Sequence, residues 1–167
     1  PKARRAVVSA LGQFREAEAA GEALAGLVGR GDPSLFVEAE AADALGRTRA
    51  PIARAAIERA LETKDSLYET VRAGATRALG HLADPGVLPT LAQRLRYGQH
   101  QRVRSAAALA LAEVGARLVV LDAVRDLLEP RLDDPDFRVQ ITAIVALKAL
   151  GDERAIGALR RTAEQAV

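Results

Sequence analysis

Apolar residues recur along this chain in a short pattern that repeats at a nearly constant interval. The pair Ala-Leu marks each copy, and a valine, or an alanine in the first copy, stands eight residues before each leucine. The pairs are Ala10-Leu11, Ala44-Leu45, Ala78-Leu79, Ala110-Leu111 and Ala146-Leu147. Successive pairs are 34, 34, 32 and 36 residues apart. Such a period indicates an array of similar supersecondary units.

Within each copy the apolar residues follow the period of an α-helix. When the ten residues that start at the valine or alanine are placed at 100° intervals, positions one, five, eight and nine fall within one narrow arc. Position five holds alanine in four copies and Val7 in the first. We therefore predict an amphipathic helix over each copy.

Turn signals and a further helical stretch separate the copies. The turn signals are Asp32-Pro33-Ser34, Asp65-Ser66, Gly98-Gln99 and Asp133-Asp134-Pro135. Asp or Ser can cap the helix that follows, and Pro suits its first turn. The further stretches cover residues 51–61, 87–95 and 118–128, and their apolar residues also recur at helical spacing.

The predicted unit is a hairpin of two antiparallel helices, in which the Ala-Leu helix comes second. One hairpin cannot bury its own apolar stripe, so neighbouring hairpins are expected to stack around a continuous core. We predict an all-α superhelix of about ten helices in about five antiparallel pairs, forming a single domain over residues 1–167. The chain is expected to start on a second helix, over residues 2–14, and to end on a first helix, over residues 153–165.

This assignment of helices to hairpins leaves the initial helix without its hairpin partner. The sequence also begins with Pro1 and contains no methionine. We therefore expect the chain to be cut from the C-terminal part of a longer protein, where another segment packs against the first helix. Removal of an initiator methionine is the alternative.

Composition and charge limit the classes of molecule that this chain is expected to bind. Lys and Arg number 24 against 22 Asp and Glu, a net charge of +2, and the two signs alternate along the chain. Nucleic-acid binders concentrate positive charge on one face, so no nucleic-acid partner is expected. No apolar stretch approaches the ~20 residues that span a bilayer, so no membrane partner is expected either. The absence of cysteine excludes disulfides and fits a cytoplasmic location.

Candidate catalytic groups are few. His81 and His100 are 19 residues apart, whereas catalytic zinc usually takes three protein ligands, often two histidines four residues apart on a helix. We expect His81 to be partly exposed near a helix end and His100 to lie in an exposed turn. No serine lies in a Gly-x-Ser-x-Gly elbow, and no phosphate-binding loop is present. We predict no catalytic residue, metal ligand or cofactor in this chain.

Three arginines share position two of the repeat: Arg4, Arg72 and Arg104. Glu38 and Gln140 replace them in the other two copies. Position two flanks the apolar stripe, so we expect these side chains to pair with an acidic turn residue such as Asp65 or Asp133. A phosphate site would require the basic residue in every repeat, which favours a structural arginine ladder over ligand binding.

Positions three, six and seven face away from the stripe, toward the wall that second helices of such arrays usually present as concave. They are polar or small in the first copies and become Ile141, Ile144 and Val145 in the last, with Leu109 at position seven of the copy before. Exposed apolar clusters mark contact surfaces, so these four residues form a candidate docking patch. The alternative is that the C-terminal turn of the chain encloses the last helix.

The repeats resemble the HEAT-like family, including the short bacterial repeats of phycobilin lyases. The likeness rests on Val71-Arg72, Ala75, Ala78-Leu79-Gly80, Leu82 and Asp84-Pro85, and on the matching residues within 103–115 and 139–152. It implies a helical solenoid, a fold that serves scaffolds, adaptors, lyases and some DNA glycosylases.

A narrower likeness concerns residues 34–48, 96–104 and 133–139. These stretches are similar to the HEAT-like C-terminal region of bacterial aminopeptidases of the aminopeptidase N type. The resemblance implies a zinc aminopeptidase as the parent, in which the helical region packs on the catalytic domain and helps bound the peptide chamber. Neither the His-Glu-x-x-His motif nor the Gly-Ala-Met-Glu-Asn segment of that family occurs here, so zinc is implied for the parent alone.

These observations leave three candidate functions. The first is a non-catalytic accessory domain whose partner is the upstream catalytic domain of a zinc aminopeptidase. The second is a free-standing adaptor that binds another protein. The third, a lyase or glycosylase relative, has only fold analogy behind it, and the low aromatic content of 3% leaves few rings to stack on a displaced base.

Overall fold

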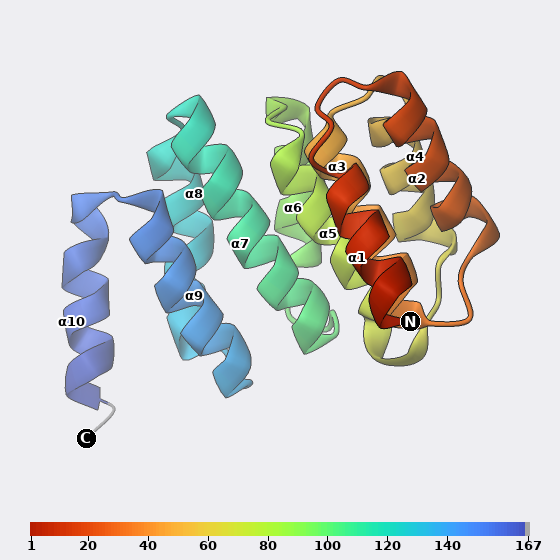
Figure 1. Ribbon diagram of the computed structural model, residues 1–167. Coiled ribbons are helices and arrows are strands. Elements are labelled where there is room, and N and C mark those ends of the chain that lie inside the picture. The colour runs from red at the N-terminus through yellow and green to blue at the C-terminus, as the bar shows by residue number, and fades with distance from the viewer. Residues whose placement is uncertain (166–167) are drawn as a thin grey trace. The chain divides into compact units, whose positions relative to one another are not determined.

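The computed structural model describes residues 1–165, and these residues form helices and turns without any strand. The α-helices are α1 (Lys2–Leu11), α2 (Glu18–Arg30), α3 (Leu35–Thr48), α4 (Ala53–Thr63), α5 (Thr70–His81), α6 (Leu88–Arg94), α7 (Gln101–Leu118), α8 (Leu121–Leu128), α9 (Phe137–Leu150) and α10 (Ile156–Gln165). Short 3-10 helices are η1 (Leu67–Glu69), η2 (Pro85–Val87), η3 (Glu129–Asp133) and η4 (Glu153–Ala155). The predicted all-α class is confirmed (Figure 1).

Contacts divide the chain into two compact units, Pro1–Leu82 and Ala83–Val167. The single domain over 1–167 stays a prediction, and each unit is described by itself. In the first unit the second helices α1, α3 and α5 pack in sequence, and α2 and α4 pack on α3 and α5 (Figure 1).

The second unit repeats this plan. Helices α7 and α9 pack against each other, α6 packs on α7, and α8 packs on α9. The 3-10 helix η3 continues from α8 and also contacts α9, while α10 contacts η3 and η4. The described residues therefore contain complete hairpins α2–α3, α4–α5, α6–α7 and α8–α9, with α1 and α10 as single helices.

The predicted apolar stripe forms the core of each unit. Positions one, five, eight and nine of the last four copies are almost entirely buried; in the second copy they are Val37, Ala41, Ala44 and Leu45. Replacing a leucine at position nine by alanine should cost about 2–5 kcal/mol, because it removes buried apolar surface and leaves a cavity.

Glycine and alanine bring second helices close together. A Cβ atom placed on Gly46 would lie 2.3 Å from the carbonyl oxygen of Ala78, and one on Gly74 would lie 2.4 Å from that of Ala39. Helices α3 and α5 therefore approach backbone to backbone, which only residues without large side chains permit.

Several helix bounds differ from the prediction. The initial helix ends at Leu11 rather than residue 14, and the final stretch divides into η4 and α10. Helix α7 continues to Leu118 and ends where Val119 takes a left-handed conformation, φ 56°. The helix predicted over 118–128 consequently begins only at Leu121.

Candidate protein-interaction site

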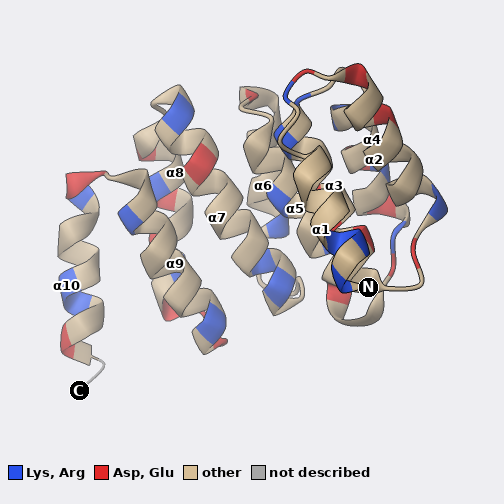
Figure 2. Ribbon diagram, viewed as in Figure 1, with Lys and Arg blue, Asp and Glu red and all other residues tan. Residues whose placement is uncertain are grey.

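The four residues of the candidate docking patch lie on α7 and α9 of the second unit. Leu109 is 37% exposed, Ile141 56%, Ile144 39% and Val145 48%. The opposite side of α9 carries Ala143, Ala146, Leu147 and Leu150, all buried. Ile141, Ile144 and Val145 thus form the outer face of α9, whose inner face is fixed in the core, and Figure 2 shows the middle of α9 without charged residues.

Two positions on this side of the helix, six and ten, are covered in the other copies. Position six is occupied in chain order by Val8, Ala42, Thr76, Ala108 and Ile144. The first four residues are buried, and only Ile144 is exposed. Position ten follows the same rule, since Gly12, Gly46, Gly80 and Ala112 are buried and Lys148 is exposed.

The covering element is the next second helix wherever both helices belong to one unit. Helix α3 packs on α1, α5 on α3, and α9 on α7. Within residues 1–165, α10 packs mainly on η3 and η4 rather than on α9. It therefore leaves the patch on α9 open. The patch is therefore the face on which a further second helix would stack.

Basic residues border this patch. Arg102 and Arg138 occupy equivalent positions at the start of α7 and α9, and Lys148 lies one turn beyond Ile144. All three are exposed. The Arg138 guanidinium lies 5.0 Å from the centre of the Phe137 ring and 3.7 Å from an Asp136 oxygen.

The corresponding wall of the first unit is charged. Glu40 of α3 accepts hydrogen bonds from Arg5 of α1 at 3.1 Å and from Arg47 at 3.0 Å. Asp43, one turn further along, pairs with Arg47 and lies 3.3 Å from the Arg77 guanidinium of α5. This polar network joins three neighbouring second helices.

Both carboxyl groups of the network are held ionised. Burial alone would raise the pKa of Asp43, but the hydrogen bond with His81 and the charges of Arg77 and Arg47 outweigh it, so this pKa lies below its ordinary value. For Glu40 burial again opposes ionisation, and hydrogen bonds from Arg47 and Arg5 lower the pKa. The network therefore stabilises the first unit as a set of charge-assisted hydrogen bonds.

The arginine ladder makes hydrogen bonds at each of its three positions. Arg104 forms a two-pronged pair with Asp134, at 2.7 and 3.1 Å, and both side chains are buried. Arg4 makes the equivalent pair with Asp32, at 3.1 and 3.2 Å, with its own side chain half exposed.

The prediction that Asp65 and Asp133 are the acidic partners of the arginine ladder was wrong. Arg72 pairs with Glu69 and donates to the Leu61 carbonyl at 3.0 Å, because left-handed residues at 68 and 69 fold the turn before α5 against the helix start. The partner of Arg104 is Asp134 rather than Asp133. The Asp134 carboxylate accepts the backbone N–H of Asp136 at 3.0 Å, and this hydrogen bond turns it inward.

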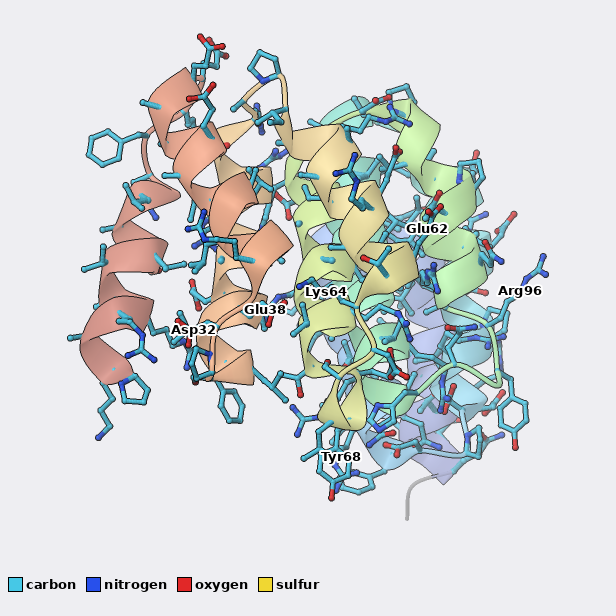
Figure 3. The ribbon with its side chains drawn as sticks, turned by 90° about the vertical axis from the view of Figure 1, so that its right-hand side faces the viewer. Asp32, Glu38, Glu62, Lys64, Tyr68 and Arg96 are labelled. Carbon is cyan, nitrogen blue, oxygen red and sulfur yellow. The ribbon has the colours of Figure 1, made fainter. Side chains whose placement is uncertain are left out.

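Glu38 and Gln140 take the place of arginine without breaking the ladder. Glu38 pairs with Lys64 at 2.8 Å, between α3 and the segment that follows α4 (Figure 3). Gln140 donates to the Asp134 carbonyl at 2.7 Å. Position two is thus hydrogen-bonded within the chain in four copies and ion-paired within it in the second.

The histidines also have structural partners. His81 is partly exposed, as predicted, and its Nε2 lies 3.2 Å from Asp43 Oδ1. The expectation of an exposed His100 was wrong, because it is half-buried and its Nδ1 accepts the Arg102 N–H at 3.2 Å, capping α7. Residues 1–165 contain no group of three or more His, Cys, Asp or Glu side chains arranged to hold a metal ion.

Sequence reasoning missed the charged network of the first unit. The signal was present, since Glu40, Asp43 and Arg47 are spaced three and four residues apart on one face of α3. Their partners Arg5 and Arg77 occupy wall positions of the neighbouring copies.

A comparison with protein families agrees with this architecture. A family model described as HEAT repeats matches residues 30–112, 65–129 and 98–166, which together extend over most of the chain. A search of curated proteins found no match. None of the helices in the described part of the chain is both long and apolar enough to cross a membrane. The stacked hairpins and the three overlapping matches show that this chain belongs to the HEAT-repeat family.

Proposed function

We propose that this chain is a non-catalytic HEAT-repeat scaffold that binds another protein through the open face of α9. The observation that carries the proposal is position six of the repeat, which is buried in four copies and exposed as Ile144 in the fifth. Exposed apolar clusters mark contact surfaces, so this open apolar face favours a role in binding another protein.

The energetics favour association at this face. Covering apolar side chains contributes about 25 cal/mol for each Å² removed from water, and three of the four patch residues are large β-branched side chains. These side chains stand on a helix whose other face is buried, so little conformational freedom is lost on binding. Arg4, Glu38 and Arg104 near the repeat turns are ion-paired within the chain, which supports a structural use for them.

Site-specific photo-cross-linking tests this proposal. A photoreactive phenylalanine analogue is introduced at position 141 of the chain produced in its own cells, and at position 123 as a control, because Ala123 is exposed on α8 of the same unit. We expect one defined protein adduct, identified by mass spectrometry, from position 141 and none from position 123. Equal labelling at both positions, or no protein adduct at 141, would contradict the proposal.

A narrower form of this function makes the partner the catalytic domain of a zinc aminopeptidase, joined to this chain in one polypeptide. Its support is the likeness of residues 34–48, 96–104 and 133–139 to the helical C-terminal region of such enzymes. The chain would then be an accessory domain that helps enclose the peptide chamber, and we expect a cytoplasmic location.

The native polypeptide tests the narrower form. An antibody raised against residues 1–165 is used to isolate the protein from its cells, and its mass, peptides and zinc content are measured. A product several hundred residues longer, with a His-Glu-x-x-His peptide and bound zinc, would support the aminopeptidase parent. A product without that peptide would exclude it and leave the scaffold proposal intact.

A further inference from the structure

We infer that the second unit has a further binding site, on the turns that lead into α7 and α9, and that this site binds an extended acidic segment of another protein. The site consists of residues 96–102 and 133–138, named here the turn edge. Neighbouring hairpins stack through their helix faces, so the turns at the hairpin tips stay exposed wherever a hairpin stands in an array. The inference goes beyond the proposed function, which concerns the α9 face.

Aromatic side chains lie at the surface of this protein rather than in its core. The three phenylalanines and two tyrosines are each at least 59% exposed, whereas the buried apolar residues that the structure describes are Ala, Val, Leu and Ile. Four of these rings lie in the turns that lead into second helices or at the starts of those helices: Phe36, Tyr68, Tyr97 and Phe137. Aromatic residues are enriched in contact surfaces, so the hairpin tips are favoured as places of contact.

The turn edge of the second unit combines two of these rings with three arginines. Tyr97 is 75% exposed and Phe137 60%. Arg96, Arg102 and Arg138 are exposed beside them. Figure 2 shows basic residues at the starts of α7 and α9, and these two helices pack against each other. The rings and the guanidinium groups therefore belong to one edge of one unit.

The guanidinium groups of this edge keep donors for a partner. Among residues 1–165, Arg96 and Arg102 form no ion pair, and Figure 3 shows the Arg96 side chain extending away from the ribbon. Arg138 lies over the Phe137 ring and no closer than 3.7 Å to Asp136. Because a guanidinium has five N–H donors in a planar fork, each of the three can bind a carboxylate of another molecule.

The buried Arg104 joins the two turns of the edge. Its guanidinium donates to both Asp134 oxygens, at 2.7 and 3.1 Å, and to the Gln99 carbonyl. It also lies 5.9 Å from the centre of the Tyr97 ring. The turn before α7 and the turn before α9 are thus held together before any partner binds. A site fixed in this way loses little conformational freedom on binding.

Charge and ring placement select an acidic peptide segment as the occupant. Arginine clusters recognise acidic motifs, because guanidinium–carboxylate pairs are charge-assisted and often two-pronged. The exposed rings lie between the arginines in the sequence and can cover apolar side chains of the same segment. A segment in which Asp and Glu alternate with apolar residues therefore matches the turn edge.

Two aspartates on the edge disfavour a nucleic acid. Asp133 is exposed, and the half-buried Asp136 caps α9 by accepting the Arg138 N–H at 2.9 Å. Phosphates follow one another without interruption in a nucleic acid, so some would face these carboxylates. A peptide can place an uncharged residue there. The net charge of +2 for the whole chain is also low for a nucleic-acid binder.

Selection from a displayed library of random short peptides tests this inference. We expect the parent chain to enrich peptides in which several Asp or Glu residues alternate with apolar residues. A fluorescein-labelled copy of the most enriched peptide then gives the dissociation constant by fluorescence anisotropy. Because the pairs formed by the turn edge lie near solvent, the affinity should fall as the salt concentration rises.

Two double variants with the same change of charge locate the site. Arg96→Ser with Arg102→Ser removes two guanidinium groups of the turn edge, and Arg160→Ser with Arg161→Ser removes two exposed ones from α10 of the same unit. We expect the first pair to weaken binding of the enriched peptide at least about tenfold and the second less than about twofold. Tyr97→Ser should weaken it at least about fivefold. All five sites are exposed, so circular dichroism should show an unchanged helix content.

Several outcomes would overturn the inference. They are a library that yields no enriched peptide, enriched peptides without an excess of acidic residues, and equal weakening by the two double variants. Tighter binding of a labelled single-stranded oligouridylate than of the enriched peptide, lost in the turn-edge double variant, would identify a nucleic-acid site instead.

The same measurements separate this inference from the proposed function. If Tyr97→Ser and the turn-edge double variant bind the peptide as the parent chain does while Ile144→Ser does not, the peptide occupies the α9 face, and the turn-edge inference fails alone. Photo-cross-linking from position 141 reports on the α9 face. A failure there, with peptide binding lost only in the turn-edge variants, would contradict the proposed function and leave this inference standing.

Discussion

Helices α3 and α9 are second helices of the same repeat, yet their outer faces differ in chemistry and in exposure. Helix α3 carries small and acidic residues, Ala42 and Asp43, and α5 covers them. Helix α9 carries Ile144 and Val145 at the same positions, and both are exposed. A residue's position in the repeat determines which side of its helix it lies on. The neighbouring helix determines whether that side is buried in the core or exposed at the surface.

The largest expected contrast is between Ala42→Glu and Ile144→Glu, the same change at position six. Glutamate at 42 would be buried without a partner against α5, so we expect a loss of more than about 4 kcal/mol and an unfolded first unit. Glutamate at 144 would reach water, so we expect a change within about 0.5 kcal/mol. Urea unfolding followed by circular dichroism measures both; equal losses would refute the comparison.

The arginine ladder allows a second contrast. Arg104→Ala would leave Asp134 buried and uncompensated, so we expect a loss of about 3–5 kcal/mol. Arg4→Ala removes a pair in which the arginine is 54% exposed, so the loss should stay below about 1 kcal/mol. The same unfolding measurement applies, and a larger loss for Arg4→Ala would mean that burial does not govern the ladder.

The charged network predicts a smaller effect, which depends on pH. The folded pKa values of Glu40 and Asp43 lie below their ordinary values of 4.5 and 3.8. Their stabilisation is therefore complete above these ordinary values and is lost as the pH falls through the lower folded values. Asp43→Asn should lower stability at pH 7 and make the acid-induced loss less steep.

Thermal unfolding from pH 7 to pH 2 measures this effect. Ile144→Ser, on the uncharged wall, serves as the control and should keep the acid dependence of the parent chain. An Asp43→Asn variant with that same acid dependence would show that the network contributes nothing to folding.

Much of the fold was predictable because helical periodicity depends only on residue spacing. The stripe of Val37, Ala41, Ala44 and Leu45 specifies which face is buried, and all four residues are buried. Helix ends were less predictable, because Val119 ends α7 through its backbone conformation and no residue type signals that.

The site was predictable in part for the same reason. The positions of Ile141, Ile144 and Val145 follow from the repeat, but their exposure depends on which helix lies beside α9. The partners of Arg72 and Arg104 were misassigned because turn geometry decides which carboxylate points inward. His100 caps α7 because it lies in the turn directly before this helix, and its residue type alone did not indicate that role.

The central claim is that position six is covered in every copy except the last, and cysteine labelling tests it most directly. The chain contains no cysteine, so each variant carries a single thiol. Ile144→Cys and Ala108→Cys occupy the same position in neighbouring repeats of one unit, and their rates of reaction with a maleimide are compared in dilute folded protein. The account predicts rapid labelling at 144, near the rate in denaturant, and labelling at 108 at least about a hundredfold slower, as expected for an opening cost of about 2.7 kcal/mol or more. Similar rates at the two positions would contradict it.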